Sequence, residues 1–77
     1  MNQLNQITHK IKHNIGDVVF LKTDSEQFDR IITGIMLHPQ NAVTYRLSCG
    51  TIETWHYDIE ISDEIDVLKT LNKNEIS

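Results

Sequence analysis

The chain has 77 residues, of which 39% are hydrophobic and 23% charged, with a formal net charge of −4 and one cysteine, Cys49. This composition is typical of a folded protein and argues against disorder, and a single cysteine excludes both an internal disulfide and a cysteine-rich zinc site. A domain of this size builds one thin core and has little material left to line a deep cleft, which argues against an enzyme.

The first six residues are polar and lack the apolar core of a signal peptide. No apolar run approaches the roughly 18 residues that a membrane span needs. We therefore expect a cytoplasmic protein with no membrane partner. The negative net charge also disfavours nucleic acid as a ligand, because affinity for phosphates comes largely from Lys and Arg.

Residues 1–14 form a flanking segment whose pattern has two interpretations. Leu4, Ile7 and Ile11 recur at spacings of three and four, as they would on one face of a short helix. The same segment also alternates as a strand would, with Ile7, His9, Ile11 and His13 separated by Thr8, Lys10 and Lys12. Both interpretations stay open.

Residues 15–61 are predicted to form a small barrel. Gly16 and Asp17 form a turn in which Gly16 needs a conformation that a side chain would resist, and Asp17 accepts backbone hydrogen bonds. Pro39 and Gly50 mark later turns. The runs between these signals predict short strands at 18–21, 30–37, 42–49, 51–57 and 59–61. No helix-length segment interrupts them, so the sheet must be mainly antiparallel.

Residues 62–77 are predicted to form a short helix or a tail. Ser62 or Asp63 would cap the helix, and Ile65, Leu68 and Leu71 would share one side of it.

The central segment resembles the Tudor and KOW group of SH3-like barrels. In that group a Gly-Asp pair opens the first strand, an Arg-led strand and a Tyr-led strand with a turn glycine follow, and an apolar strand closes the barrel. The matching segments are Gly16–Leu21, Arg30–Ile35, Tyr45–Gly50 and Ile59–Ile61. The chain is also similar to small barrel proteins that bacterial genomes and prophages encode. The resemblance implies a five-stranded antiparallel SH3-like barrel that acts as an interaction module.

The sequence departs from the group in two respects. Tudor modules cage a methylated cation between aromatic rings, and Ser48 and Cys49 occupy one place where a cage ring usually lies. KOW modules that bind RNA are basic, whereas this chain is acidic. The resemblance therefore does not name the ligand.

Side-chain alternation along the predicted strands separates a core face from an outer face. The residues expected in the core are Val19, Leu21, Val43, Tyr45, Leu47 and Trp55, with Ile31 and Ile35 also directed inward. The residues left on the outside form an apolar stripe of Val18, Phe20, Ile32 and Met36. A monomer seldom exposes such a stripe. We expect the ends of the chain, a second copy or another protein to cover it.

The resulting prediction is a non-enzymatic protein-interaction module, a phage or mobile-element accessory protein that docks on a protein partner or on itself as a homodimer. No cofactor is expected. The alternative is a nucleic-acid-binding barrel in which basic side chains hold the backbone and two aromatic rings stack on bases. Its contacts would be Lys10, Lys12, Lys22, Arg30, Arg46, Trp55 and Tyr57.

Two further patterns are weaker. His9 and His13 would suit a shared metal on a helix, but no acidic third ligand lies near them in sequence, so we predict no metal site and solvent-exposed histidines. Cys49 and His56 could face each other across the Gly50 turn as nucleophile and base. Because Cys49 follows the phase of the core strand, its thiol should be buried and inert, and we predict no catalytic residue.

Overall fold

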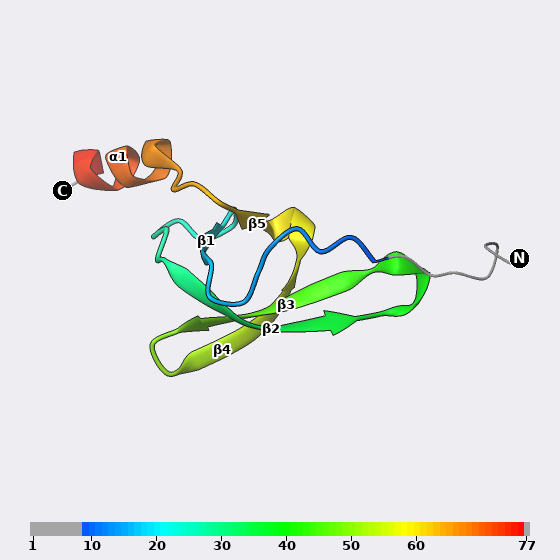
Figure 1. Ribbon diagram of the computed structural model, residues 1–77. Coiled ribbons are helices and arrows are strands. Elements are labelled where there is room, and N and C mark those ends of the chain that lie inside the picture. The colour runs from blue at the N-terminus through cyan, green and yellow to red at the C-terminus, as the bar shows by residue number, and fades with distance from the viewer. Residues whose placement is uncertain (1–8, 77) are drawn as a thin grey trace, which may run out of the picture.

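The computed structural model describes residues 9–76, which form one antiparallel sheet followed by a short helix (Figure 1). The strands are β1 (Val18–Leu21), β2 (Arg30–Leu37), β3 (Val43–Cys49), β4 (Ile52–Tyr57) and β5 (Ile61–Ser62), and the helix is α1 (Val67–Ile76). Two 3-10 turns, η2 (Pro39–Asn41) and η3 (Asp58–Glu60), precede β3 and β5. The predicted mainly-β fold of five antiparallel strands with a short C-terminal helix is confirmed.

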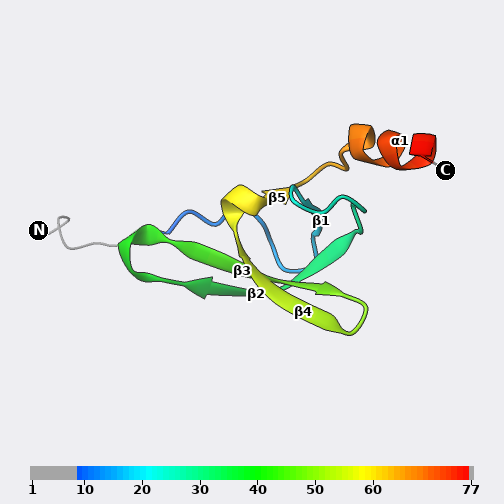
Figure 2. The same ribbon diagram turned by 180° about the vertical axis from the view of Figure 1, so that it is seen from behind.

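The sheet is bent but open. Its strand order is β4-β3-β2-β1-β5, so β4 and β5 lie at its two margins. In both Figure 1 and Figure 2, β1 and β5 lie to one side of the long strands β2, β3 and β4. No pair of described strands joins β4 to β5, and closure into a barrel is therefore not confirmed.

One small apolar cluster forms the core. Its members are Val19, Leu21, Ile32, Val43, Tyr45, Leu47 and Ile61, each at most 7% exposed. Five of the six residues predicted for the core are among them. The sixth, Trp55, is 44% exposed, and its placement in the core was wrong. Trp55 lies opposite Arg46, and Arg46 points away from the face that its neighbours Tyr45 and Leu47 share.

A β-bulge in β2 explains two further errors. The pairing with β3 shifts between Ile32 and Gly34, so Thr33 is an extra residue. Ile32 and Ile35 consequently both face the core, although they are three positions apart. Ile31 was predicted inward and is 48% exposed, while Ile32 was predicted outward and is fully buried. Ile35 packs against the core as predicted.

The turn before β1 matches its prediction. Gly16 has a φ of +99°, which favours glycine, and its N–H donates to the carbonyl of Ile32 at 2.8 Å. The Asp17 carboxylate accepts a hydrogen bond from the Asn14 N–H at 2.9 Å.

The ends of the chain differ from expectation. Residues 9–14, here named the N-terminal strap, are irregular, neither helix nor strand, while Leu4 and Ile7 lie outside the described residues. At the other end, α1 begins after Asp66, whose carboxylate accepts a hydrogen bond from the Leu68 N–H at 3.1 Å. Asp66 is thus the cap, not Ser62 or Asp63. The helix projects away from the sheet (Figure 1).

Candidate functional site

The side of the sheet opposite the core carries exposed apolar side chains, and we name it the outer face. Directly paired residues share a face, so the register builds three rows across the strands. These rows are Val18–Ile31–Ser48–Glu53, Gly34–Arg46–Trp55 and Met36–Thr44–Tyr57. The apolar and aromatic members are each 44% to 51% exposed: Val18, Ile31, Met36, Trp55 and Tyr57.

The predicted outer stripe is therefore only partly correct. Val18 and Met36 lie on the outer face, whereas Ile32 belongs to the core because of the bulge. Phe20 is half-buried and lies opposite Ser62 at the β1–β5 pair. Ile31, Trp55 and Tyr57 complete the outer face. Ile31 and Trp55 were expected to point inward, and Trp55 and Tyr57 were otherwise named only as contacts of the alternative nucleic-acid site. No described part of the chain was found to pair with the outer margin of β4, next to Trp55 and Tyr57.

Arg46 is fixed beside Trp55 at the centre of the outer face. Its guanidinium donates to the Thr33 hydroxyl at 2.9 Å and to the Thr33 carbonyl at 2.8 Å. Its Cζ lies 5.8 Å from the centroid of the Trp55 ring, within cation–π range. A Cβ at Gly34 would come within 3.2 Å of this side chain, so glycine leaves Arg46 room to lie across β2. The bulge at Thr33 thus also orients Arg46.

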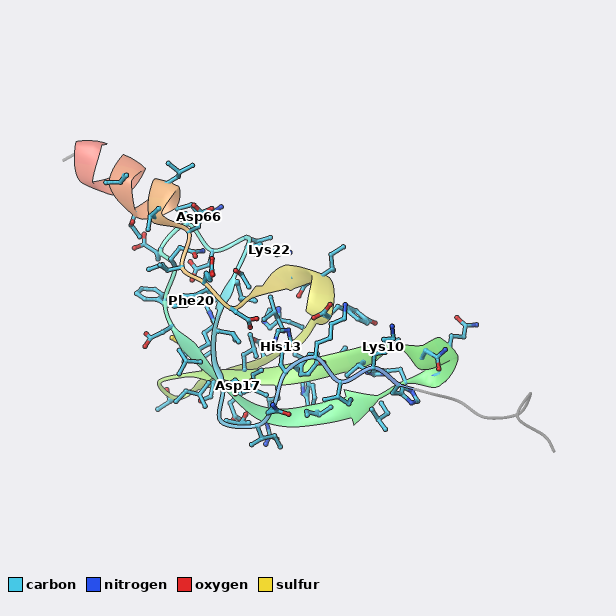
Figure 3. All side chains as sticks on the ribbon, turned by 45° about the horizontal axis from the view of Figure 1, so that its top comes forward. Lys10, His13, Asp17, Phe20, Lys22 and Asp66 are labelled. Carbon is cyan, nitrogen blue, oxygen red and sulfur yellow. The ribbon has the colours of Figure 1, made fainter. Side chains whose placement is uncertain are left out.

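A groove of about 500 Å³ lies beside the outer face, between the N-terminal strap, the turn before β3 and the end of β4. It is lined by Lys10, Lys12, Asn41, Ala42, Val43, Tyr57, Asp58 and Ile59. Figure 3 shows Lys10 near the turn that joins β2 and β3. The Lys12 ammonium donates to Asp58 at 3.0 Å, so one of the two lysines is already paired.

The strap is held to the sheet by His13, which is only 6% exposed. His13 Nε2 lies 3.0 Å from Asp58 Oδ1, and Nδ1 lies 3.3 Å from Asp63 Oδ1. The ring meets Tyr45 edge-on at 5.0 Å, and the Tyr45 hydroxyl accepts a hydrogen bond from the Lys12 N–H. In Figure 3, His13 lies on the strap next to the turn before β5. We name His13, Asp58 and Tyr45 the strap clamp.

The histidines were expected to be solvent-exposed, and this expectation was wrong. His13 is buried, and His9, His38 and His56 are half-buried. Each makes a specific contact: His9 with the carbonyl of His38, His38 with the hydroxyl of Thr44, and His56 with Glu60 and Thr54. Among the described residues, no three potential ligands gather as a metal site would require.

The structure does not bring Cys49 and His56 together. Cys49 pairs with Ile52 at the hairpin turn, whereas His56 pairs with Tyr45, which lies four residues before Cys49 in β3. Four residues of strand correspond to about 13 Å. Cys49 is free and half-buried rather than fully buried.

The residues predicted to contact nucleic acid fall into separate places. Lys10, Lys12 and Tyr57 share the groove, and Arg46 and Trp55 lie on the adjacent outer face. The Arg30 side chain is 15% exposed and pairs with Asp24 at 2.9 Å. Lys22 lines a second hollow, of about 410 Å³, with the acidic Glu64 and Asp66.

Three carboxyl groups have lowered pKa values. Burial opposes ionisation of Asp24 and Asp58, but hydrogen bonds outweigh it and hold the pKa of both carboxyls below the usual range. Arg30 and the backbone N–H groups of Glu26 and Phe28 donate to Asp24, and the side chains of Lys12 and His13 bond to Asp58. The hydrogen bond from Lys69 lowers the pKa of Asp66.

These shifts predict acid-induced loss of stability. A carboxyl whose pKa is lower in the folded state than in the unfolded chain, where it is about 3.9, stabilises the fold above that value. The contribution is lost as the pH falls through the folded-state pKa. Urea unfolding followed by circular dichroism should show the free energy of unfolding falling below about pH 4. Asp24→Asn should be less stable at neutral pH and lose less on acidification. An equal loss in parent and variant would show that Asp24 does not contribute.

Comparison of the chain with protein-family models, with curated proteins and with solved structures yields no match. In the part of the chain that the structure describes, no helix is both long enough and apolar enough to cross a bilayer.

Proposed function

We propose that the protein is a non-enzymatic interaction module whose outer face docks on a protein surface. The supporting observation is the set of half-exposed side chains on that face, which centres on Trp55 beside a fixed Arg46. Trp, Tyr, Met and Arg are the residue types enriched at protein interfaces. Because Arg46 is already held by Thr33, little side-chain entropy would be lost when a partner contacts it.

A photo-crosslinking residue in place of Trp55 tests this proposal, with the same residue in place of Leu68 as the control. Leu68 is 68% exposed and lies in α1, away from the outer face and the groove. A protein captured only from position 55 is then purified, and its affinity for unmodified chains is measured by calorimetry. Trp55→Ala should weaken binding by about 30-fold or more, as interface hot spots do. Leu68→Ala should leave the affinity unchanged. Equal capture at both positions, or equal affinities, would contradict the proposal.

A second candidate function is binding of single-stranded nucleic acid, which the shared groove of Lys10, Lys12 and Tyr57 favours. Trp55 does not line this groove, so binding is followed by the fluorescence anisotropy of a labelled mixed-sequence oligonucleotide. The anisotropy should rise on binding, and the affinity should fall steeply with salt. Anisotropy that stays unchanged at low salt would exclude this candidate.

A further inference from the structure

The margin of the sheet at β4 lacks the usual protection against pairing. Edge strands of soluble proteins are commonly very short, or carry lysine, proline or a bulge. β5, at the other margin, has two residues and fits this rule. β4 has six, contains neither lysine nor proline, and is exposed at every position except the half-buried His56. No described strand occupies its free side.

We infer that this margin pairs with the β4 margin of a second copy of the chain, antiparallel, about a two-fold axis at Trp55. This inference rests on the proposed function and identifies the protein partner of that function as a second copy of the chain. A two-fold axis perpendicular to the sheet keeps the outer faces of both copies on the same side. Trp55 then lies opposite Trp55 of the second copy, and Glu53 lies opposite Tyr57.

This register is self-complementary. Two tryptophan rings meet at the axis, and aromatic cross-strand pairs stabilise antiparallel sheets. The Glu53 carboxylate faces a Tyr57 hydroxyl, which can donate a hydrogen bond, and no like charges lie directly opposite each other. The Arg46 side chains of the two copies are three strand spacings apart, about 14 Å, so salt screens their repulsion. Another protein would have to reproduce this pattern, whereas a second copy already carries it.

The pairing would also limit the assembly to two chains. Both copies use the same margin, so a two-fold contact closes at two chains. The remaining margins, both β5, are too short to continue the sheet. The dimer would cover part of the Trp55 and Tyr57 side chains, which are 44% and 51% exposed in the single chain.

A charge exchange at position 55 tests both the contact and its register. Sedimentation velocity should show that the parent is a dimer, and that Trp55→Lys and Trp55→Glu are each monomeric, because like charges then meet at the axis. An equimolar mixture of the two variants should form a heterodimer at low salt. The control, Leu68→Lys, adds the same charge on α1, which projects away from the sheet, and should remain dimeric.

A second measurement does not depend on folding of the variants. Hydrogen exchange of the β4 amides in the parent should slow as the protein concentration rises, and the emission of Trp55 should shift to shorter wavelength. A parent that stays monomeric up to about 1 mM, or variants that stay monomeric when mixed, would overturn the inference. If a monomeric parent still yields a specific crosslinked partner at position 55, the dimer fails and the interaction module stands. If neither is found, both fail.

Discussion

Replacing Ile32 with alanine should lower the free energy of unfolding by about 2–5 kcal/mol, whereas the same change at the adjacent Ile31 should cost less than about 1 kcal/mol. Ile32 is fully buried opposite Leu47, so truncation removes buried methyl groups and leaves a cavity. Ile31 is 48% exposed and loses few contacts. For a domain of this size, with a total stability of about 5 kcal/mol, the first variant would be close to unfolding at room temperature.

The pair is a matched comparison, because both variants make the same chemical change in the same strand. Urea unfolding followed by circular dichroism measures both free energies. A larger loss at Ile31 than at Ile32 would mean that β2 continues without the bulge at Thr33 and that the outer face is wrongly assigned. A Thr33→Ala variant would not test the bulge by itself, because Thr33 also holds the Arg46 side chain through a hydrogen bond.

The positions of the strands could be predicted from the sequence, because strand and turn signals depend only on neighbouring residues. Short alternating runs of β-branched and aromatic residues between turn signals specify four of the strands to within one residue, and the short last strand less closely. The side chains of the third strand alternate without interruption, and Val43, Tyr45 and Leu47 are buried as expected. The turn at Gly16 is equally local, since its conformation depends on the residues beside it.

The errors arise where a single residue decides which side of the sheet the following side chains of the strand face. A glycine inside a strand often marks a bulge, so Gly34 was an available signal that β2 changes phase near Thr33. The error at Trp55 was also avoidable. A two-residue turn at Gly50 and Thr51 fixes Cys49 opposite Ile52, and counting back places Trp55 opposite Arg46. The outer face could therefore have been predicted from those two signals.

The strap clamp could not have been predicted from the sequence. His13 and Asp58 are separated by 45 positions, and nothing local to either residue indicates the other. Their contact depends on where η3 lies after β4 has paired with β3, which is a property of the whole sheet. The same holds for Gln27, whose side-chain carbonyl accepts a hydrogen bond from the Asp66 N–H 39 positions away. Long-range polar contacts of this kind hold the N-terminal strap and the segment before α1 to the sheet.

The second large effect is expected at the strap clamp. His13→Ala should lower the free energy of unfolding by about 1–3 kcal/mol, because it removes the hydrogen bond to the Asp58 carboxylate and an aromatic contact with Tyr45. Asp58→Asn should cost less, since Lys12 is its other side-chain partner and is exposed. Because the two residues touch, the double variant should lose less than the sum of the single losses, with a coupling of about 0.5–3 kcal/mol.

Hydrogen exchange of the His13→Ala variant distinguishes release of the strap alone from a general loss of stability. In His13→Ala, amides of residues 9–14 should exchange faster while those of β3 keep their protection, because only the strap is released. Lys10→Ala, on the same strap but exposed, is the control and should leave both rates unchanged. Release of the strap would also remove the wall of the groove that carries Lys10 and Lys12. A coupling near zero, with strap amides as protected as in the parent, would show that His13 fills space without holding the strap.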